Sequence, residues 1–470
     1  MFNMNLNQDS LRGKQVLVVG AARSGISACK FLLEKGACIT LFDSKESVAL
    51  GAEVIALGEQ GVSLLLGNRL PEEFIFELVV KSPGVPPTVP ILQAAYENAV
   101  PVIGELELAY HYAAIPFVAI TGTNGKTTTT SLTDYMFKTA VIRSLLGGNI
   151  GIPLIDVIED YSEGFAVAEV SSFQLDDCLD FKPHIAAVLN LSPDHLDRYG
   201  SFENYIKSKS RIFMNQDSDD YAVLNYDDPL LRNMAGELER QKTVWFSCQS
   251  RPSDARGAYG LIYIEKNKDK NAVIIEINNK KTNVTNTSDI YIKGRHNLQN
   301  ALAATACAFL AGVDTFSIAI ALKDFRGVEH RQELFAEKDG VIYINDSKGT
   351  NCDSTLMALE VYDRPIILVA GGRHKGGSFR ELMQYAAQKV RLLIVLGECR
   401  EQLISEARAE GISNIIDCDS LEAVVSAAVD NAVSGDVVLL SPACASWDMF
   451  ENYEQRGKLF KKLVLEKLGI

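Results

Sequence analysis

A glycine-rich turn between an apolar run and a helical pattern is the segment best suited to chemistry. Gly122-Thr-Asn-Gly-Lys-Thr127 follows the apolar run Phe117–Ile120. Glycines let backbone N–H groups face phosphate oxygens, and the start of a helix adds a favourable dipole. Lys126 can neutralise charge on the β- and γ-phosphates, and the hydroxyl of Thr127 can bind Mg²⁺. Ile120 stands where the usual phosphate loop has its first glycine, yet the context still predicts a nucleoside-triphosphate site.

Two side chains further along the chain could bind the metal of such a triphosphate. Glu169 ends the apolar run Ala166–Glu169, where a carboxylate is costly unless it has a partner. The alternative is an edge strand in which Glu169 faces water. His195 follows another apolar run and stands beside Asp194 and Asp197, which could also cap the next helix. A lone histidine is most often a surface residue, but its place after a strand favours a metal ligand.

A group of cations follows in a helical pattern. Lys207, Lys209 and Arg211 have the spacing of a solvated basic face. Spacing alone does not single out Lys209.

The N-terminal segment has the pattern of a nucleotide-binding βαβ unit. A strand at Lys14–Val19 is followed by the turn Gly20–Gly25, a helix to about Lys35 and a strand at Cys38–Phe42. The glycine spacing is G-x-x-x-x-G rather than G-x-G-x-x-G, so a dinucleotide is not indicated. A second turn, at Leu78–Gly84, could bring backbone N–H groups to an anion. For both turns, a purely structural role explains the residues equally well.

Strand-like runs alternate with helical patterns along the whole chain, which predicts an α/β fold in three domains. We expect a Rossmann-like domain over 1–104, a central phosphate-loop domain over 105–327 and a second Rossmann-like, doubly wound domain over 328–470. The central domain should combine a parallel sheet with a small antiparallel meander at its edge. The runs that predict the meander are Gly260–Lys266, Ala272–Ile277 and Asp289–Lys293. Ligands in doubly wound sheets bind beyond the carboxyl ends of the strands, where the polar motifs of this chain occur.

Composition limits the class of protein. The chain has 470 residues and a net charge of −14, which argues against broad binding to nucleic acid. It has neither a signal-peptide pattern nor an apolar run long enough to span a membrane. Its nine cysteines form no C-x-x-C pair and no close Cys/His cluster, so a structural zinc site is not predicted. We expect a cytoplasmic, monomeric protein with reduced thiols.

Taken together, the motifs resemble those of the Mur ligase family over essentially the full length. They are GTNGKT (122–127), Glu169–Leu175, NLSPDHLDRY (190–199), Tyr205–Arg211, Gly294–Ala303, Glu329–Arg331, Asn345–Asn351, Gly371–Lys375, Leu440–Ser446 and Glu454–Gly457. GTNGKT is shared by the wider superfamily, including folylpolyglutamate synthetases. The LSPACAS and EQRG segments resemble the branch that adds D-glutamate, and the chain has no DNPR-like motif for diaminopimelate or lysine.

The resemblance implies an ATP site with two Mg²⁺ ions. ATP-binding positions would be Gly122, Thr123, Asn124, Gly125, Lys126, Thr127, Thr128, Asn297, Asn300, Arg331 and Asp346. Within this set, Asn297 and Asn300 would lie around the adenine, Arg331 at a phosphate and Asp346 at the ribose. Metal ligands would be Thr127, Glu169, His195 and Lys209, the last carbamylated by CO₂. Catalytic positions would be Lys126, Glu169, His195, Lys209 and Lys348.

The resemblance also implies two small-molecule substrates, UDP-N-acetylmuramoyl-L-alanine and D-glutamate. The first would contact Ala22, Arg23, Ser24, Asp43, Ser44, Lys45, Ser82, Pro83, Gly84 and Asn149. The second would contact His330, Lys348, Thr350, Lys375, Ser446 and Tyr453, where the family often has Phe at the last position. The implied reaction is ATP-dependent amide formation through an acyl phosphate, releasing ADP and phosphate, in peptidoglycan precursor synthesis.

Three alternatives remain at this point. The chain could be a different Mur ligase or a folylpolyglutamate synthetase, which an assay of amino-acid acceptors would separate. It could be a regulatory protein that hydrolyses ATP without any acceptor. The N-terminal βαβ unit also allows a dinucleotide-dependent oxidoreductase, against which the missing G-x-G-x-x-G and the presence of GTNGKT argue.

Overall fold

A computed structural model describes residues 10–46, 51–67, 69–238, 240–255, 257–266, 270–373 and 376–470. The chain forms two compact units. The first comprises Met1–Ile290 with Gln299–Asp324, and the second comprises Tyr291–Leu298 with Phe325–Ile470. Three β-sheets covered by helices confirm the predicted α/β class. Among the described residues, no helix combines the length and the apolar character needed to cross a membrane.

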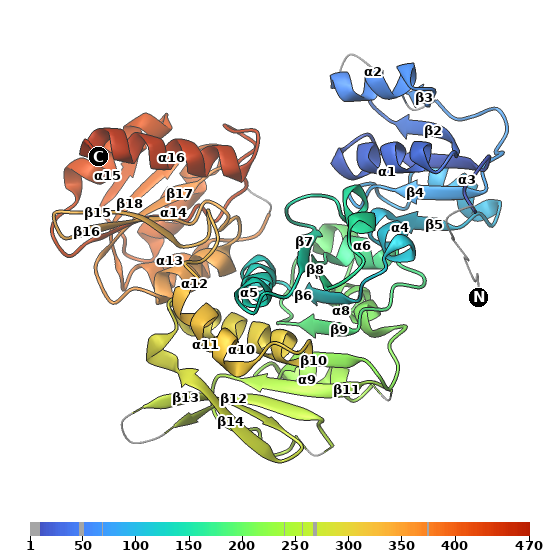
Figure 1. The fold of residues 1–470 in the computed structure, drawn as a ribbon. Helices are drawn as coiled ribbons and strands as arrows, with labels where there is room; N and C mark the ends of the chain where they lie inside the picture. The colour runs from blue at the N-terminus through green and yellow to red at the C-terminus, as the bar shows by residue number, and fades with distance from the viewer. Residues whose placement is uncertain are drawn as a thin grey trace. The chain divides into compact units, whose positions relative to one another are not determined.

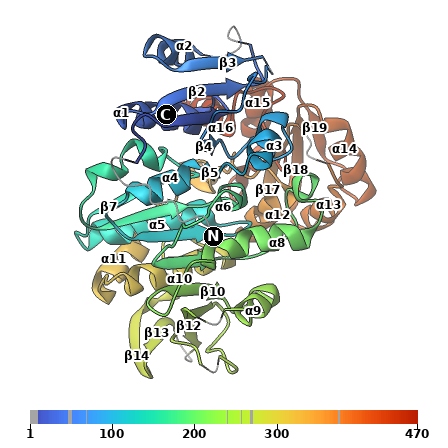
Figure 2. The ribbon, with the colours of Figure 1, turned by 90° about the vertical axis from the view of Figure 1, so that its right-hand side faces the viewer.

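The N-terminal sheet has five parallel strands in the order β3-β2-β1-β4-β5. Its strands are β1 (Gln15–Val19), β2 (Cys38–Asp43), β3 (Ser63–Leu66), β4 (Leu78–Lys81) and β5 (Val102–Gly104). Its helices are α1 (Arg23–Glu34), α2 (Ala52–Glu59), α3 (Pro90–Glu97) and α4 (Glu105–Tyr112). Val16 and Val18 face α1, α2 and α4, whereas Leu17 and Val19 face α3. Figure 2 shows α1 and α3 on opposite sides of the sheet.

The central sheet has nine strands in the order β14-β13-β12-β11-β10-β9-β6-β8-β7. The strands from β7 to β12 in this order run parallel, and β13 and β14 are antiparallel to their neighbours. The parallel strands are β6 (Phe117–Thr121), β7 (Ser144–Gly148), β8 (Phe165–Glu169), β9 (Ile185–Val188), β10 (Tyr221–Asn225), β11 (Lys242–Ser247) and β12 (Gly260–Lys266). One buried apolar cluster continues from the N-terminal sheet into this one, which makes the first unit compact.

The antiparallel meander lies at the edge of this sheet, as predicted, but its third strand is not where the sequence placed it (Figure 1). It consists of β12, β13 (Asn271–Ile277) and β14 (Lys280–Asn286), whereas 289–293 forms no strand. The predicted strand was wrong because none of the seven residues of β14 is buried, so no apolar alternation marks it. Asn278 and Asn279, both with positive φ, form the turn of a two-residue hairpin and were the available signal.

The helices of the central sheet connect its strands and carry polar loops at their starts. They are α5 (Lys126–Thr139), α6 (Ser172–Asp176), α7 (Leu196–Tyr199), α8 (Phe202–Ser210), α9 (Pro229–Ala235), α10 (Arg295–Leu310) and α11 (Thr315–Asp324). Short 3₁₀ turns are η2 (Leu154–Asp156), η3 (Ile158–Asp160), η4 (Arg211–Phe213) and η5 (Thr287–Asp289). The helix expected from about Asn297 begins two residues earlier and ends at Leu310 as predicted.

The C-terminal sheet has six strands in the order β15-β16-β20-β17-β18-β19, all parallel except β15. They are β15 (Glu333–Lys338), β16 (Val341–Asn345), β17 (Ile366–Gly371), β18 (Val390–Leu396), β19 (Ile415–Asp417) and β20 (Val437–Leu440). The helices are α12 (Cys352–Glu360), α13 (Arg380–Ala386), α14 (Arg400–Ala409), α15 (Leu421–Asn431) and α16 (Tyr453–Leu468). Ile366 and Leu368 pack against α12–α14, and Ile367 and Val369 against α15 and α16, which is the two-layer cover expected of a doubly wound sheet.

Candidate active site

The glycine-rich turn has the geometry of a phosphate loop. It joins β6 to α5, and Gly125, at the N-terminal cap of α5, has a φ of 85°. A Cβ on Gly125 would overlap Asn300 Oδ1, so both the backbone angle and the space require glycine. Lys126 Nζ donates to the carbonyl oxygens of Gly122 and Thr123 at 2.9 and 2.8 Å. The lysine therefore lies across the loop in which the sequence predicted phosphate binding.

A second polar loop braces the phosphate loop. Asn190 follows β9, which is the neighbour of β6 in the sheet. Its side chain accepts from the Asn124 N–H at 2.8 Å and donates to the Asn124 carbonyl at 3.0 Å. Thr123 Oγ1 donates to the Ser192 carbonyl and accepts from the Ser192 N–H. These bonds hold the loop that leads to His195 directly against the phosphate loop.

Glu169 is at the end of an interior strand. Because β8 pairs with β6 on one side and β7 on the other, the alternative of a water-facing edge strand is wrong. The residue is 1% exposed, and its carboxylate accepts a hydrogen bond of 2.8 Å from Asn149 Nδ2. Asn149 N–H also donates to the Glu169 carbonyl at 2.8 Å. Asn149, predicted as a contact of the UDP substrate, thus lies beside the predicted metal ligand.

His195 begins the short helix α7 from a left-handed backbone conformation, with a φ of 52°. Its ring is 44% exposed and lies 4.8 Å, between centroids, from Phe173. Asp194 accepts from the His195 N–H at 2.9 Å and lies 3.7 Å from Nε2. The imidazole is therefore held by its neighbours and is partly exposed to solvent.

Lys209 is the residue that sequence spacing misjudged. It is 1% exposed on α8, and its Nζ donates to the Gly122 carbonyl at 2.9 Å. The Thr121 hydroxyl lies 3.4 Å from the same Nζ, and the Tyr205 ring 4.7 Å. Burial, with a smaller effect of the Lys126 charge, holds the pKa of Lys209 well below its usual range. The prediction of a solvated basic face holds for the exposed Lys207 but is wrong for Lys209.

The predicted contacts of the UDP substrate gather at the carboxyl ends of β1, β2 and β4, which are adjacent strands. Asp43 accepts from the backbone N–H groups of Ala21 and Lys45 at 2.8 and 2.9 Å. Ser82 Oγ donates to the Gly20 carbonyl at 3.1 Å and accepts from Ser24 Oγ at 3.3 Å. The structure therefore brings together the three segments 22–24, 43–45 and 82–84, and Asn149 lies apart from them beside Glu169.

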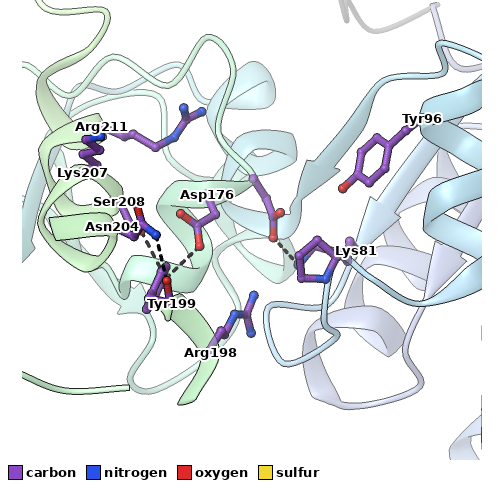
Figure 3. Close-up of a pocket in the computed structure, with 11 residues that line it drawn as sticks. Lys81, Tyr96, Asp176, Arg198, Tyr199, Asn204, Lys207, Ser208 and Arg211 are labelled. Atoms are coloured by element: carbon purple, nitrogen blue, oxygen red, sulfur yellow. Dashed lines mark hydrogen bonds and ion pairs between the residues drawn. The ribbon is translucent and has the colours of Figure 1, made fainter. Parts of the chain in front are cut away.

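A cavity of about 470 Å³ is lined by Lys81 and Pro87, on either side of segment 82–84 (Figure 3). Its lining residues are Lys81, Pro87, Tyr96, Asp176, Asp177, Arg198, Tyr199, Asn204, Lys207, Ser208 and Arg211. Figure 3 shows Tyr199 pointing toward Asp176 and Ser208, which its hydroxyl meets at 2.8 and 3.2 Å. The cavity therefore borders α7, which begins directly after His195, and α8, which contains Lys209.

Sequence reasoning missed the ion pair that links β4 to the segment after α6. Lys81 Nζ lies 2.7 Å from Asp177 Oδ2, and both side chains are buried. Burial raises the pKa of Asp177 to about 6, although the Lys81 charge opposes this shift. Arg198 adds a bond of 2.9 Å to the Pro83 carbonyl. A lysine at the end of the apolar run Leu78–Lys81 was the signal that could have indicated such a partner.

In the second unit, the carboxyl ends of β16, β20 and β17 meet at one edge of the sheet. Asp346 follows β16 and is buried; it accepts from Ser441 Oγ at 2.7 Å and from the Gln332 N–H at 3.1 Å. Burial raises the pKa of its carboxyl to about 6. The predicted ribose contact is thus a buried acceptor at the carboxyl ends of the strands, where such sheets bind ligands.

The predicted D-glutamate residues lie beside this edge. The buried His330 accepts at Nδ1 a hydrogen bond of 2.8 Å from Asn345 Nδ2, and its ring is 6.0 Å from that of Tyr453. The Lys348 N–H donates to the His330 carbonyl, and Lys348 Nζ lies 5.2 Å from the Tyr453 ring. His330, Lys348 and Tyr453 are therefore brought together.

The remaining predicted residues of this unit have separate positions. Ser446 is buried in the turn after β20, and the Thr350 N–H donates to the Lys348 carbonyl at 2.9 Å. Arg331 pairs with Val328 through the backbone, and Asn297 Nδ2 donates to the Lys293 carbonyl at 2.9 Å. Lys375 lies outside the described residues.

Arg456 is a buried cation to which the sequence analysis gave no role. Its Nε donates to Ser347 Oγ at 2.9 Å and its Nη2 to the Ser347 carbonyl at 2.7 Å. Burial lowers the pKa of its guanidinium to about 10. Arg456 therefore holds Ser347, the residue between the predicted ligand-binding residues Asp346 and Lys348. The EQRG segment contained this arginine, but only the fold shows its contact.

Substitution of Gly125 tests the phosphate loop. We expect Gly125→Ala to lower kcat/KM for ATP at least about tenfold, because strained backbone of this kind costs about 1–3 kcal/mol. Initial rates at varied ATP measure this. Gly51→Ala is the matched control, since Gly51 also caps a helix but a Cβ there meets nothing within 4 Å. Equal rates for wild type and Gly125→Ala would contradict the assignment.

Substitution of Asp346 tests its burial through pH. Its pKa is raised on folding from 3.8 to about 6, so between these values the folded state binds more protons than the unfolded state. This contribution to stability is present below pH 4 and is lost as pH rises through 6, by at most about 3 kcal/mol. The free energy of unfolding of Asp346→Asn, measured with urea at pH 4.5 and at pH 7, should not show this loss. Asp363→Asn, at a fully exposed side chain, is the control, and identical pH profiles for all three proteins would refute the prediction.

The chain is similar to known proteins over nearly its full length. Three family models match: "Mur ligase MurD-like, N-terminal domain" over 14–104, "Mur ligase middle domain" over 120–308 and "Mur ligase, glutamate ligase domain" over 330–444. A UDP-N-acetylmuramoylalanine–D-glutamate ligase of Pelotomaculum thermopropionicum is 45% identical, covering 96% of this chain and 97% of the relative. One of Clostridioides difficile is 42% identical, covering 96% and 98%.

Solved structures share the fold. MurF ligase of Thermotoga maritima, solved in complex with ADP, is 19% identical with a TM-score of 0.58 and covers 98% of this chain and 97% of its own. UDP-N-acetylmuramate-alanine ligase MurC of Thermotoga maritima is 19% identical with a TM-score of 0.57, covering 97% and 99%. The three matched domains and the full-length relatives together establish that this chain belongs to the Mur ligase family.

Proposed function

We propose that this protein joins the carboxylate of UDP-N-acetylmuramoyl-L-alanine to the amine of D-glutamate in an ATP-dependent reaction of peptidoglycan synthesis. The observation that carries the proposal is the phosphate loop 122–127, with Lys126 across it, in a chain whose full-length relatives are D-glutamate ligases. The two substrates are small anions, in keeping with basic side chains at the predicted sites of a chain of net charge −14.

An amide does not form readily from a carboxylate and an amine, because the oxygen of a carboxylate is a poor leaving group. In the proposed reaction the carboxylate attacks the γ-phosphorus of ATP, which gives an acyl phosphate and ADP. The amine of D-glutamate then attacks the acyl carbon, loses a proton, and phosphate leaves. Several anions meet in these steps, so positioning and charge neutralisation supply most of the catalysis.

The residues of the first unit would supply the charge for phosphoryl transfer. Lys126 would leave the Gly122 and Thr123 carbonyls and bind the β- and γ-phosphates of ATP. Thr127, Glu169 and His195 would hold Mg²⁺: a hydroxyl and a buried carboxylate are the oxygen donors this ion prefers. Bound there, Mg²⁺ supplies positive charge to the phosphate oxygens. Asn300, beside Gly125, would contact the nucleotide.

We further propose that Lys209 is carbamylated. Its amine is buried against the phosphate loop, 2.9 Å from the Gly122 carbonyl, where a permanent cation has no carboxylate bonded to it among the described residues. A neutral amine adds to CO₂ and releases one proton, which gives a carbamate with two oxygens. Such a carboxylate-like group would be the ligand of a second Mg²⁺.

The other substrates would occupy the strand ends. Segments 22–24, 43–45 and 82–84 would hold the UDP portion with backbone N–H groups and hydroxyls, and Asn149 would contact the substrate near Glu169. In the second unit, Arg331 and Asp346 would contact ATP. His330, Lys348, Thr350, Ser446 and Tyr453 would receive D-glutamate, with Lys348 binding a carboxylate. In this proposal the three domains span residues 1–104, 105–327 and 328–470.

An isotope experiment tests the acyl phosphate directly. UDP-N-acetylmuramoyl-L-alanine labelled with ¹⁸O in its carboxylate is turned over with ATP and D-glutamate, and the released phosphate is analysed by mass spectrometry. We expect one ¹⁸O in each phosphate, because the carboxylate oxygen that attacked phosphorus leaves with it. Unlabelled phosphate would contradict the proposed intermediate.

A further inference from the structure

A cluster of three ligand-type side chains lies away from the proposed active site, where α4 meets the segment after α6. Glu107 and His111 stand one turn apart on α4, and Asp180 faces them. His111 Nε2 lies 3.3 Å from Glu107 Oε1 and 3.6 Å from Asp180 Oδ2. The three ligand atoms are all within 4.8 Å of one another. One carboxylate, one imidazole and a second carboxylate thus converge on one point.

The separations suit a metal ion better than a hydrogen bond. A tetrahedral site with bonds of about 2.0–2.1 Å places neighbouring ligand atoms about 3.3–3.4 Å apart. The two separations from His111 Nε2 lie close to that edge length. Nε2 itself is buried and makes no hydrogen bond to any described residue. A ring nitrogen between two carboxylates without a hydrogen bond is the arrangement that an ion would complete.

The surroundings hold the ligands in place. Glu107 is fully buried, and its two oxygens accept the backbone N–H groups of Asp180 and Phe181 at 2.6 and 3.0 Å. Such outer bonds fix the orientation of a carboxylate ligand. The His111 side chain is 11% exposed, whereas Asp180 is 37% exposed. Asp180 is the most exposed of the three ligands, so an ion and a water as fourth ligand would enter from its side.

We propose that Glu107, His111 and Asp180 bind a divalent transition-metal ion of the zinc class. Imidazole and carboxylate at the separations of a four-coordinate site suit Zn²⁺, Co²⁺ and similar ions, whereas Mg²⁺ requires an octahedral set of six ligands. The ion ties α4, which follows the N-terminal sheet, to the loop between α6 and β9 of the central sheet. It is a structural site, independent of the ligase reaction. The spacing Glu107-x-x-x-His111 was its sequence signal, because residues four apart share one helix face.

Two other groups of similar composition differ in one decisive respect. Glu329, His330 and Glu333 also converge, but Lys461 Nζ lies 2.8 and 2.7 Å from the two carboxylates and neutralises them. His184 has Asp220 at 3.2 Å, and Lys182 lies 3.4 Å from the same carboxylate. The Glu107 cluster has no lysine or arginine ion pair among the described residues. No lysine or arginine therefore neutralises its two carboxylates, and a metal ion would do so.

Cobalt titration of the full-length chain tests the site. The protein is stripped of metal with a chelator, and the chelator is then removed. It is titrated with Co²⁺, whose visible absorption reports protein ligands, and then with Zn²⁺ as competitor. We expect one equivalent of Co²⁺ absorption that Zn²⁺ displaces and that is absent or at least about tenfold weaker in affinity in His111→Gln. Any Co²⁺ bound near Glu169 and His195 would be present in the wild type and in every variant, so it would not change the difference between them.

Two further variants make the test decisive. Asp180→Asn, at a partly exposed side chain, should weaken Co²⁺ binding as His111→Gln does, and it serves if the buried variant fails to fold. His184→Gln removes a histidine beside a single acid and should bind Co²⁺ like the wild type. The proposal is overturned if wild type shows no saturable absorption, if Asp180→Asn binds as tightly as wild type, or if His184→Gln loses the same equivalent. D-glutamate-dependent phosphate release, measured alongside, reports on the proposed reaction separately.

Discussion

Lys126→Ala is expected to remove ATP-dependent turnover, with kcat lower by about 10²–10³-fold. Loss of one preorganised charged group at a developing anion typically has an effect of this size. The physical reason is the position of Nζ, which lies over the phosphate loop and donates to its carbonyl oxygens at 2.9 and 2.8 Å. Phosphate release under saturating substrates measures kcat.

Lys138→Ala is the matched control for this prediction. Lys138 lies in the last turn of the same helix, where it is exposed and forms an i,i+4 pair with Asp134 at 2.7 Å. Its removal should leave kcat within about twofold, because Lys138 lies at the opposite end of α5 from the phosphate loop. A near-normal rate for Lys126→Ala would show that the loop does not bind the transferred phosphate.

Lys209→Ala is expected to be nearly inactive, with kcat at least about 10²-fold lower, and to be partly restored by a small added carboxylate such as acetate. Alanine leaves a space against the phosphate loop, where Nζ was 2.9 Å from the Gly122 carbonyl, and a small carboxylate can take the place of the carbamate oxygens. Rates at increasing acetate concentration measure the rescue.

Lys207→Ala controls for the loss of a lysine from the same helix. Lys207 is exposed two residues before Lys209 and borders the cavity instead of the phosphate loop. It should keep most activity and gain nothing from acetate. An active Lys209→Ala enzyme, or equal stimulation of wild type and variant by acetate, would contradict the carbamate.

The phosphate loop could be predicted from sequence because its signals are local. Strand, glycines, lysine and helix start are contiguous at 117–127, and each follows from backbone geometry. The strands buried on both faces were likewise found as apolar runs. The edge strand β14 was missed because its residues are half-buried or exposed, and its pairing with β13 depends on the Asn278-Asn279 turn.

The rest of the candidate site depends on distant contacts that spacing cannot show. Lys209 looks like a surface lysine until α8 packs against the carbonyl of Gly122, 87 residues earlier. Lys81 meets Asp177 across two sheets, and Arg456 meets Ser347 across most of the C-terminal domain. Family resemblance singled out Lys209 but gave no role to Lys81, Asp177 or Arg456. A buried charge becomes visible only when the fold supplies its partner.

The most direct test of the proposed reaction is phosphate release with ATP, Mg²⁺ and UDP-N-acetylmuramoyl-L-alanine across a panel of amino acids, with the product weighed by mass spectrometry. We predict release that requires D-glutamate and a product heavier by one glutamate residue. Release driven by L-lysine or diaminopimelate instead would keep the family and contradict the assigned acceptor. Release that needs no amino acid would contradict amide formation itself.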